Sequence, residues 1–349
     1  MVAQKEFISG NEAVVRAALS VGAEAFFGYP ITPTTEILHF WAQEAENNKK
    51  LLFLQTEDEI AAGFAQIGAL FGEKIAFTAT AGVGNILMQD AISMAEAMRL
   101  PFVAIIMQRG GPSTGTVIFS QQELNLTCFG GNGEGLRIVY SPSTSQELYE
   151  FTQKAFYTAW KYQFPTFVLG DGYLAKTKTA IELHSPSTLP QKRKILANSD
   201  KIINLYNTYS VEEDLSQNLQ KNIDEFENIA PHLCIDEITG DENYDYLVFA
   251  HGSIASSCKV AVEKLNQDNL KVALFRPVTL RPLDGEKINH FAQKAKKIFI
   301  FESSWGQFER LIKNAMSGLN IPIIHYLKPA LGIMPKNIVQ FIKSKTYEK

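Results

Sequence analysis

The sequence predicts an α/β protein with two domains, each built on a mainly parallel sheet, and three observations lead to this prediction. Short apolar runs of strand length alternate with stretches of helical spacing almost from the start of the chain. The runs are nearly continuous in apolar residues, as in strands covered by helices on both faces of a parallel sheet. The chain has 349 residues, which is long for a single hydrophobic core.

Strands and helices alternate regularly in the first part of the chain, which we assign to a domain at residues 1–185. Buried strands are predicted at 25–30, 51–55, 74–80, 102–107, 137–142 and 166–172. Helical spacing lies between them, at 11–22, 55–70, 85–99 and 145–163.

The composition changes after residue 180. HSPSTLPQKRK is rich in proline, serine and lysine, and 198–243 is polar and acidic, with one helix predicted near 211–229. We interpret 186–243 as a linker or surface excursion. A second alternating block at 244–349 predicts a smaller α/β domain. Its strands are expected in YLVFAHGS, KVALFRPV, KIFIFESS and IPIIHYL, and its helices in ASSCKVAVEKLNQ, GEKINHFAQKA and GQFERLIKNAMSG.

Charge and hydropathy exclude several classes of partner. The formal net charge of −4 and the pI near 5.9 give no electrostatic footprint for nucleic acid or an anionic membrane. Apolar runs such as FVAIIM are too short to cross a bilayer, and the N-terminus has no apolar core of a signal peptide. We therefore expect a soluble, cytoplasmic protein that binds neither nucleic acid nor membrane.

The cysteines and histidines predict no metal held by this chain alone. Cys128, Cys234 and Cys258 are scattered and form no CxxC pair, which argues for a reducing compartment and against an iron–sulfur cluster on this chain. The histidines form no HExxH or other ligand cluster. GDGY at 170–173 resembles the GDG…NN motif that binds magnesium and diphosphate in thiamine enzymes, but the asparagine pair is missing, because Ser199 follows Asn198.

Ligands in open α/β sheets gather at the carboxyl ends of strands, where the first domain has four candidate stretches. In YPITPTTE (29–36), Thr32 and Pro33 suit the start of a helix. The alternative is that the Thr32 hydroxyl and the free N–H groups of that turn bind an anion.

QTEDEIAAGFAQIGAL (55–70) places three acids at the start of a predicted helix. Thr56 and Glu59 fit the capping-box pattern T-x-x-E, and acids suit the positive end of the helix dipole. Capping does not explain the small residues Ala61, Ala65 and Gly68, which recur at helical spacing and would let neighbours come close.

The other two stretches are glycine-bearing turns. TATAGVGN (78–85) lacks the third glycine of GxGxxG, because Leu87 stands there, so a plain tight turn is favoured over a dinucleotide phosphate turn. In QRGGPSTG (108–115), Arg109 leaves a buried strand and needs an anionic partner. That partner is either a bound carboxylate or phosphate, or an internal acid in a structural ion pair. The long glycine-rich segment 116–136 follows and is expected to be functional.

YPITPTTE, QTEDEIAAGFAQIGA and QRGGPSTG, in this order, closely resemble the α subunit of 2-oxoacid:ferredoxin oxidoreductases, especially the 2-oxoglutarate and branched-chain types. The resemblance spans nearly the whole chain. The first domain is similar to the pyrimidine-binding domain of thiamine enzymes. AHGS, RPVTLRPL and IFIFESSWGQ in the second block resemble the family's transketolase C-terminal-like domain. One departure is Asn132-Gly133-Glu134, where many relatives have His-Gly-Asp.

The resemblance implies a split active site. Thiamine diphosphate would be shared with a β subunit that carries the diphosphate-binding domain, Mg²⁺ and a 4Fe–4S cluster. Coenzyme A would be the co-substrate, ferredoxin the electron acceptor, and γ and δ subunits further partners. By motif position, Glu59 would contact the cofactor's aminopyrimidine, with Tyr29 and Pro30 beside the cofactor. Thr32 and Arg109 would lie near the substrate carboxylate, with 2-oxoglutarate the favoured substrate.

Two other function classes compete with this expectation. One is a nicotinamide-dependent dehydrogenase, against which the incomplete glycine fingerprint argues. The other is a non-catalytic structural subunit, whose acids at 57–59 only cap a helix.

Overall fold

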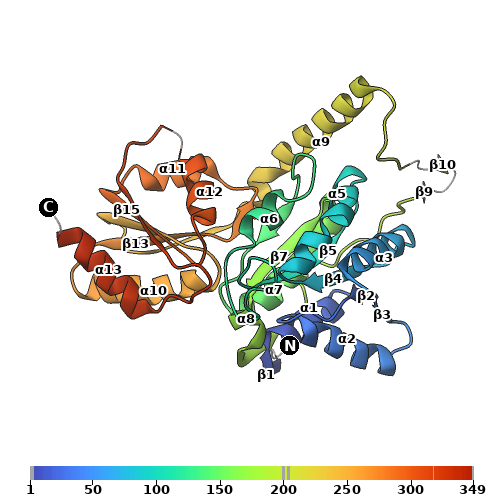
Figure 1. Cartoon of the computed structure of the whole chain (residues 1–349), viewed down its shortest axis with the longest axis horizontal. Helices are drawn as coiled ribbons and strands as arrows, with labels where there is room; N and C mark the ends of the chain where they lie inside the picture. Colours follow the sequence, from blue (N-terminus) through green and yellow to red (C-terminus); the bar gives the residue numbers. More distant parts are fainter. Residues whose placement is uncertain (1–3, 199–200, 203–204, 317, 348–349) are drawn as a thin grey trace.

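The computed structural model describes residues 4–198, 201–202, 205–316 and 318–347, and two sheets organise the chain (Figure 1). The larger sheet has seven strands in the order β14-β6-β7-β5-β4-β2-β3, and the smaller has five in the order β11-β13-β12-β15-β16. The two-domain α/β prediction is confirmed. Within the described residues no helix is both long and apolar enough to cross a membrane.

All the strands predicted for the first domain are present and run parallel to one another in the larger sheet. They are β2 (Ala25–Gly28), β3 (Leu52–Gln55), β4 (Ala76–Thr80), β5 (Val103–Gln108), β6 (Ile138–Tyr140) and β7 (Thr166–Asp171). The strand at 52–55 was predicted to be buried but is mostly exposed, because it lies at the edge of the sheet. Every residue of β4, β5 and β7 is buried, which explains the continuous apolar runs in the sequence.

The helices of the first domain cover both faces of this sheet. They are α1 (Gly10–Ser20), α2 (Thr35–Asn47), α3 (Glu59–Phe71), α4 (Val83–Leu87), α5 (Gln89–Ala97), α6 (Leu124–Phe129), α7 (Ser145–Tyr162) and α8 (Gly172–Lys176). Helix α1 packs against α2 and α7, whereas α3 packs against α5. The core centres on Phe77 of β4, whose ring meets those of Phe26, Trp41 and Phe156 at centroid distances of 4.9, 5.1 and 5.6 Å.

The second block forms the smaller sheet, as predicted. Its strands are β11 (Asp236–Gly240), β12 (Tyr246–Phe249), β13 (Val272–Pro277), β15 (Lys297–Glu302) and β16 (Ile323–Leu327). Its helices are α10 (Gly252–Gln267), α11 (Gly285–Ala292), α12 (Gln307–Ala315) and α13 (Pro335–Tyr347), and α10 packs against α13. Strand β11 is antiparallel to β13, and neither β11 nor α13 was predicted.

Three further strand pairings were not predicted either. Strand β14 (Thr279–Arg281) comes from the second block but pairs antiparallel with β6 at the edge of the first domain's sheet. Strands β1 (Gln4–Ser9) and β8 (Lys178–Leu183) form a separate antiparallel ribbon. Strands β9 (Ala197–Asn198) and β10 (Lys201–Ile202) form another.

The segment 186–243 contains the predicted helix, observed as α9 (Glu212–Leu233). This helix packs on the first domain. Arg99 donates hydrogen bonds to Asn222 Oδ1 (2.9 Å) and to Glu225 Oε2 (2.7 Å), and the rings of Phe164 and Phe226 meet edge to face. The same segment includes β11 of the smaller sheet. The domain boundaries at 185 and 243 remain predictions.

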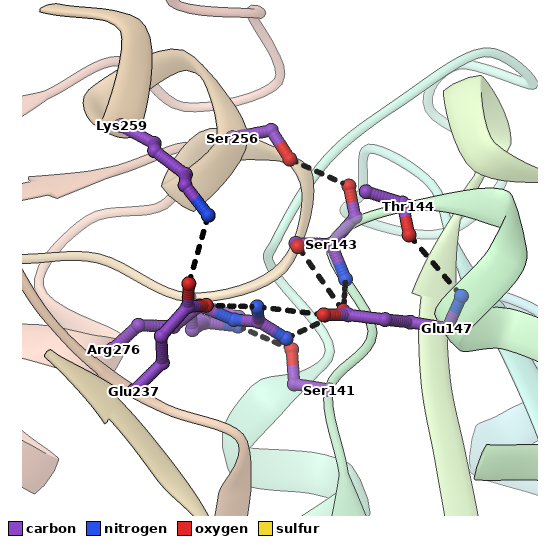
Figure 2. Close-up of polar contacts among 9 residues, drawn as sticks. Ser141, Ser143, Thr144, Glu147, Glu237, Ser256, Lys259 and Arg276 are labelled. Atoms are coloured by element: carbon purple, nitrogen blue, oxygen red, sulfur yellow. Dashed lines mark hydrogen bonds and ion pairs between the residues drawn. The ribbon is translucent and has the colours of Figure 1, made fainter. Parts of the chain in front are cut away.

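An ion-pair cluster around the buried Arg276 joins the two domains (Figure 2). Arg276 of β13 is 3% exposed and donates to both carboxylate oxygens of Glu147 on α7, at 2.9 and 2.5 Å. It also donates to Oε2 of Glu237 (2.8 Å), and the other oxygen of that carboxylate, Oε1, pairs with Lys259. A bidentate contact of this kind restricts the relative orientation of the two partners. The smaller domain is therefore fixed against the N-terminal end of α7.

Candidate active site

The candidate site lies where the strand order of the larger sheet reverses direction. The chain runs outward from β2 to β3 and then crosses back over β2 to reach β4. With right-handed crossovers, α2 and α3 then cover opposite faces, and the carboxyl ends of β2 and β4 are the place where ligands bind in open α/β sheets. The four stretches predicted from the sequence follow β2, β3, β4 and β5. The structure therefore brings them together at one edge of the sheet.

Glu59 is the first residue of α3, and its side chain points into the protein. The residue is 3% exposed, and its Oε1 atom is buried without a hydrogen-bond partner among the described residues. Burial raises the pKa of its carboxyl group, as does the neighbouring Asp58, while Arg109 acts in the opposite direction. An unpartnered buried carboxylate oxygen is costly, which indicates that the site is built to receive a hydrogen-bond donor.

Asp58, rather than Thr56, is the cap of α3, so the predicted capping box is wrong. Asp58 Oδ1 accepts the N–H of Ala61 at 2.7 Å. The Thr56 hydroxyl instead donates to the backbone carbonyl of Asp58 at 2.8 Å. Glu57 is exposed. Only one of the three acids caps the helix, and capping does not account for the buried Glu59.

The small residues of α3 do not act as predicted within this chain. Ala61 and Gly68 are exposed, and a β-carbon added at Gly68 would meet no atom within 4 Å. The close neighbour lies instead at Gly63, where a β-carbon would come 2.6 Å from the side chain of Ala91 on α5. One face of α3 near Glu59 therefore presents small side chains to the outside.

The turn after β4 fits tightly around the two candidate charged residues. A β-carbon at Gly84 would lie 2.1 Å from the Thr80 hydroxyl oxygen and 2.3 Å from Glu59 Oε1. A β-carbon at Gly82, whose φ is +55°, would lie 2.6 Å from Arg109 Nε. The Gly82 N–H is bonded to Glu123 and the Gly84 N–H to the Ala81 carbonyl. The turn is a tight turn, and these N–H groups are not free for a phosphate.

Arg109 forms no close ion pair among the described residues, although the carboxylates of Glu59 and Glu123 interact with its charge at longer range. Its role in binding an anion stays a prediction. The residue is 5% exposed, and its Nη1 donates to the Thr32 carbonyl at 2.9 Å. Its Nε is buried and has no hydrogen-bond partner in the described part of the chain. The guanidinium therefore retains donor capacity toward an anion at the carboxyl ends of these strands.

The YPITPTTE segment forms the rim on the β2 side. The helix after it begins at Thr35 with Thr34 in the N-cap position, so the prediction that Thr32 starts the helix is wrong. The Thr34 hydroxyl bonds back to the Ile31 carbonyl at 2.8 Å, which extends the loop before the helix. Thr32 is half-buried and contacts Arg109, whereas Tyr29 is exposed at the end of β2 beside the half-buried Pro30.

Two other predicted features lie elsewhere. Asp171 of the GDGY stretch is buried and caps α8, because its Oδ1 accepts the N–H groups of Tyr173 (3.0 Å) and Leu174 (3.1 Å). The exposed Asn132–Glu134 segment lies against α5, where the Asn132 N–H bonds to the Ser93 hydroxyl. Neither feature forms a hydrogen bond with Glu59 or Arg109 among the described residues.

Sequence reasoning missed Glu123 and Asn85, which are buried between the turns of the site. Glu123 accepts hydrogen bonds from both turns, and Asn85 donates to it. The only local signal is a charged residue within the glycine-rich segment 116–136, which is a weak one. Their connection depends on contacts between segments far apart in the sequence.

The raised pKa of Glu59 predicts a pH-dependent cost in stability. The folded chain binds the Glu59 proton more tightly than the unfolded chain, where the pKa is near the ordinary 4.5. Wild-type stability should therefore fall as the pH rises from that value through the raised pKa. Glu59→Gln lacks this titration, so its stability advantage should grow across the same window and then level off. Urea unfolding of both chains at a series of pH values measures the difference, and a pH-independent difference would contradict it.

Comparisons with known proteins identify the family that this chain resembles. Residues 16–230 match the family described as pyruvate flavodoxin/ferredoxin oxidoreductase, thiamine diphosphate-binding. Residues 244–336 match core domain II of pyruvate:ferredoxin oxidoreductase. The chain is 33% identical to the 2-oxoglutarate synthase subunit KorA of Methanocaldococcus jannaschii, over 89% of this chain and 92% of that protein. It is 30% identical to the ketoisovalerate oxidoreductase subunit VorB of Methanothermobacter marburgensis, over 92% of each.

Two solved structures are similar to this one. The 2-oxoglutarate:ferredoxin oxidoreductase from Magnetococcus marinus, with 2-oxoglutarate, coenzyme A and succinyl-CoA bound, superposes with a TM-score of 0.86 at 26% identity. The match covers 98% of this chain and 65% of that one. A split-gene transketolase, at 13% identity and a TM-score of 0.61, shows the shared fold alone. The chain belongs to the pyruvate flavodoxin/ferredoxin oxidoreductase family, and the similarity runs through both of its domains.

Proposed function

We propose that this chain is the α subunit of a thiamine-diphosphate-dependent 2-oxoacid:ferredoxin oxidoreductase. The complex would decarboxylate a 2-oxoacid oxidatively, transfer the acyl group to coenzyme A and pass the electrons to ferredoxin. The observation that carries the proposal is the buried Glu59 carboxylate, whose Oε1 has no partner among the described residues, at the same end of the sheet as Arg109. The relatives named as 2-oxoglutarate synthase subunits favour 2-oxoglutarate as the substrate.

The residues around Glu59 fit the pyrimidine end of the cofactor. Glu59 Oε1 and the Thr80 hydroxyl are both buried and lack hydrogen-bond partners among the described residues. They face Gly84, where any side chain would collide with them. The ionised Glu59 would accept a hydrogen bond from a pyrimidine ring nitrogen and so hold a proton there. When bound, thiamine diphosphate supplies the electron sink that decarboxylation of a 2-oxoacid requires.

Arg109 is the candidate for the substrate carboxylate. One arm of its guanidinium is held by the Thr32 carbonyl, and its Nε has no partner among the described residues. A guanidinium fixed in this way binds a carboxylate with little loss of side-chain freedom. Thr32 would thus act by orienting Arg109, with Tyr29 and Pro30 on the rim toward the cofactor.

A β subunit is proposed to cover the open side of this site. The exposed apolar residues Leu52, Leu54, Ile60, Ile86 and Leu87 surround the start of α3 and the end of α4, next to the exposed small residues of α3. Apolar surface of this kind indicates a protein interface. The partner would bring the diphosphate-binding domain, Mg²⁺ and a 4Fe–4S cluster, with γ and δ subunits as further components.

The cysteines fit a cluster carried by the partner. Cys128 lies in α6, Cys234 follows α9 and Cys258 lies in α10, so they occupy separate places. Burial raises the pKa of Cys128 to about 12 and that of Cys234 to about 11, which disfavours the thiolate form that a cluster needs. We place the protein in the cytoplasm, where unpaired cysteines stay reduced.

The assay that tests the proposed function uses the chain co-purified with its β subunit. With coenzyme A present, the complex is expected to reduce ferredoxin when given 2-oxoglutarate, with pyruvate and 2-oxoisovalerate as competing substrates. If the complex reduces ferredoxin with none of the three 2-oxoacids, the proposal is contradicted. A preference for 2-oxoisovalerate would move the substrate assignment and leave the reaction class intact. Reduction of NAD by the chain alone would support the dehydrogenase alternative.

Cofactor binding is predicted to depend on the partner. The isolated chain lacks the GDG…NN motif and has no anchor for the diphosphate. It should therefore show no tight binding of thiamine diphosphate with Mg²⁺ in calorimetry, whereas the assembled complex should bind the cofactor. Tight, magnesium-dependent binding by the isolated chain would contradict the split site.

A further inference from the structure

Glu123 is a buried carboxylate that joins the two turns of the site. The residue is 5% exposed and directly precedes α6. Its Oε1 accepts the backbone N–H of Gly82 at 2.8 Å and that of Arg109 at 3.0 Å. Its Oε2 accepts the side-chain amide of Asn85 at 3.0 Å. One carboxylate thus binds the chain where it leaves β4 and where it leaves β5.

These two turns carry the closest contacts of the candidate charged residues. Gly82 packs directly on the Arg109 side chain, and Gly84 packs directly on Glu59. A displacement of either turn would therefore move Arg109 or open the wall against Glu59. Because Glu123 binds both turns through a single oxygen atom, it fixes their separation as well as their individual positions.

A chain of buried side chains orients Asn85 toward Glu123. Asn85 Oδ1 accepts a hydrogen bond from Gln89 Nε2 at 2.9 Å, so its NH₂ group is the one that faces Glu123. Gln89 Oε1 in turn accepts from Arg137 Nη1 at 2.9 Å. Arg137 is fully buried, and its guanidinium can only donate hydrogen bonds. This fixes which group donates and which accepts at each step from Arg137 to Glu123.

The smaller domain supports the segment that carries Glu123. The Gln121 N–H donates to the Ser303 carbonyl at 3.1 Å, and Gln121 Oε1 accepts the Ser303 N–H at 3.0 Å. Gln307 Nε2 donates to the Gln122 carbonyl at 2.7 Å. Glu123 is therefore held from the second domain on one side and from α4 and α5 on the other.

We propose that Glu123, oriented by Asn85, is a positioning residue that sets the spacing of Arg109 and Glu59. The inference rests on the proposed function, because it assigns the 2-oxoacid to Arg109 and the cofactor to Glu59. Glu123 would touch neither substrate nor cofactor. Its effect reaches the substrate through the backbone of Arg109.

Glu123→Gln tests this role with the least change in shape. The amide oxygen can still accept both backbone N–H groups, but the new NH₂ group faces the NH₂ group of Asn85. In the complex with the β subunit, we expect the KM for the 2-oxoacid to rise at least about fivefold, with a smaller change in kcat. Adding Asn85→Asp restores a donor–acceptor pair and should return the KM to within about twofold of wild type. Asn85→Asp alone places two carboxylates together and should have the highest KM of the three variants.

Amide exchange provides a readout that does not depend on activity. Hydrogen–deuterium exchange should quicken in Glu123→Gln for peptides containing Gly82 and Arg109, and return toward wild type in the double variant. Glu24→Gln is the matched control. Glu24 also accepts a backbone N–H, from Ile75 at 3.1 Å. It directly precedes β2, however, and so lies at the amino ends of the strands, whereas the site lies at their carboxyl ends. It should change neither the KM nor the exchange at these turns.

The outcomes separate the two proposals. An inactive wild-type complex contradicts the proposed function, while the exchange measurement still tests whether Glu123 sets the turns. An unchanged KM and unchanged exchange in Glu123→Gln overturn the positioning role. A double variant that restores neither the KM nor the exchange rates would also overturn the positioning role. If Glu123→Gln does not fold, Asn85→Ala removes the contact to Oε2, together with the contacts of Asn85 to Gln89 and Thr127, and leaves both backbone contacts of Oε1 in place. It should raise the KM and quicken exchange at the same turns.

Discussion

Glu59→Gln in the assembled, cofactor-loaded complex is expected to lower turnover at least about a hundredfold, the usual scale for lost acid–base assistance. The amide keeps the size of the side chain and one acceptor oxygen. It loses the negative charge that would hold a proton on the pyrimidine ring. Because Glu59 is buried where no described residue satisfies its Oε1, the charge acts at short range in a site with little water.

Glu57→Gln is the matched control for this prediction. Glu57 lies two residues earlier, is exposed and does not cap the helix. Its turnover should stay within a few-fold of wild type. Steady-state ferredoxin reduction on both purified complexes gives the comparison, after thiamine diphosphate content has been measured in each. Normal turnover by Glu59→Gln in a loaded complex would remove Glu59 from the mechanism.

Much of the fold could be predicted because its signals are local. Each strand of the first sheet except β14 is an apolar run, and in central strands such as β4 and β5 burial on both faces explains why the run is continuous. Strands β14, β11, β1 and β8 could not be predicted in this way. They are short or partly exposed, and each is held by pairing with a segment far away in the sequence.

Helix starts show why a motif alone does not decide a cap. Ser9 and Glu12 form a true capping box at the start of α1, with each side chain bonded to the other's backbone N–H. Thr56 and Glu59 have the same spacing and do not form one. Asp58 lies between them and accepts the N–H of Ala61 first, which leaves Glu59 free to turn inward. Asp58 can be recognised in the sequence as a second capping candidate. Which acid caps the helix, however, depends on the space that Glu59 finds beside Gly84.

The sequence predicted which strand ends form the candidate site, but it did not predict the hydrogen-bond network that connects them. Thr32, Glu59 and Arg109 each follow a strand, so topology alone brings them to one edge. Glu123 and Asn85 belong to the same cluster, but nothing in their spacing relates them to Arg109. Their role follows from hydrogen bonds between groups 14 to 41 residues apart in the sequence, which the fold alone makes neighbours.

Arg109→Lys is expected to raise the KM for the 2-oxoacid roughly 10- to 100-fold, about 1.4–2.8 kcal/mol of lost binding. Lysine keeps the charge and loses the planar fork. In wild type one arm of the fork is held by the Thr32 carbonyl at 2.9 Å, which leaves the other nitrogens for a carboxylate. A single ammonium group on a flexible stem must serve the carbonyl and the substrate together, so it orients neither as well.

A second arginine supplies the control for this substitution. Arg99 is a structural arginine whose guanidinium binds Asn222, Glu225 and the carbonyls of Tyr162 and Gln163, far from the turns of the site. Arg99→Lys should lower the melting temperature and leave the KM unchanged. Arg109→Lys should do the reverse, because its guanidinium has no carboxylate partner among the described residues and therefore contributes little to folding through ion pairing. Steady-state kinetics and thermal melts on both complexes measure the two effects. A lowered melting temperature with an unchanged KM in Arg109→Lys would give Arg109 the same purely structural role as Arg99.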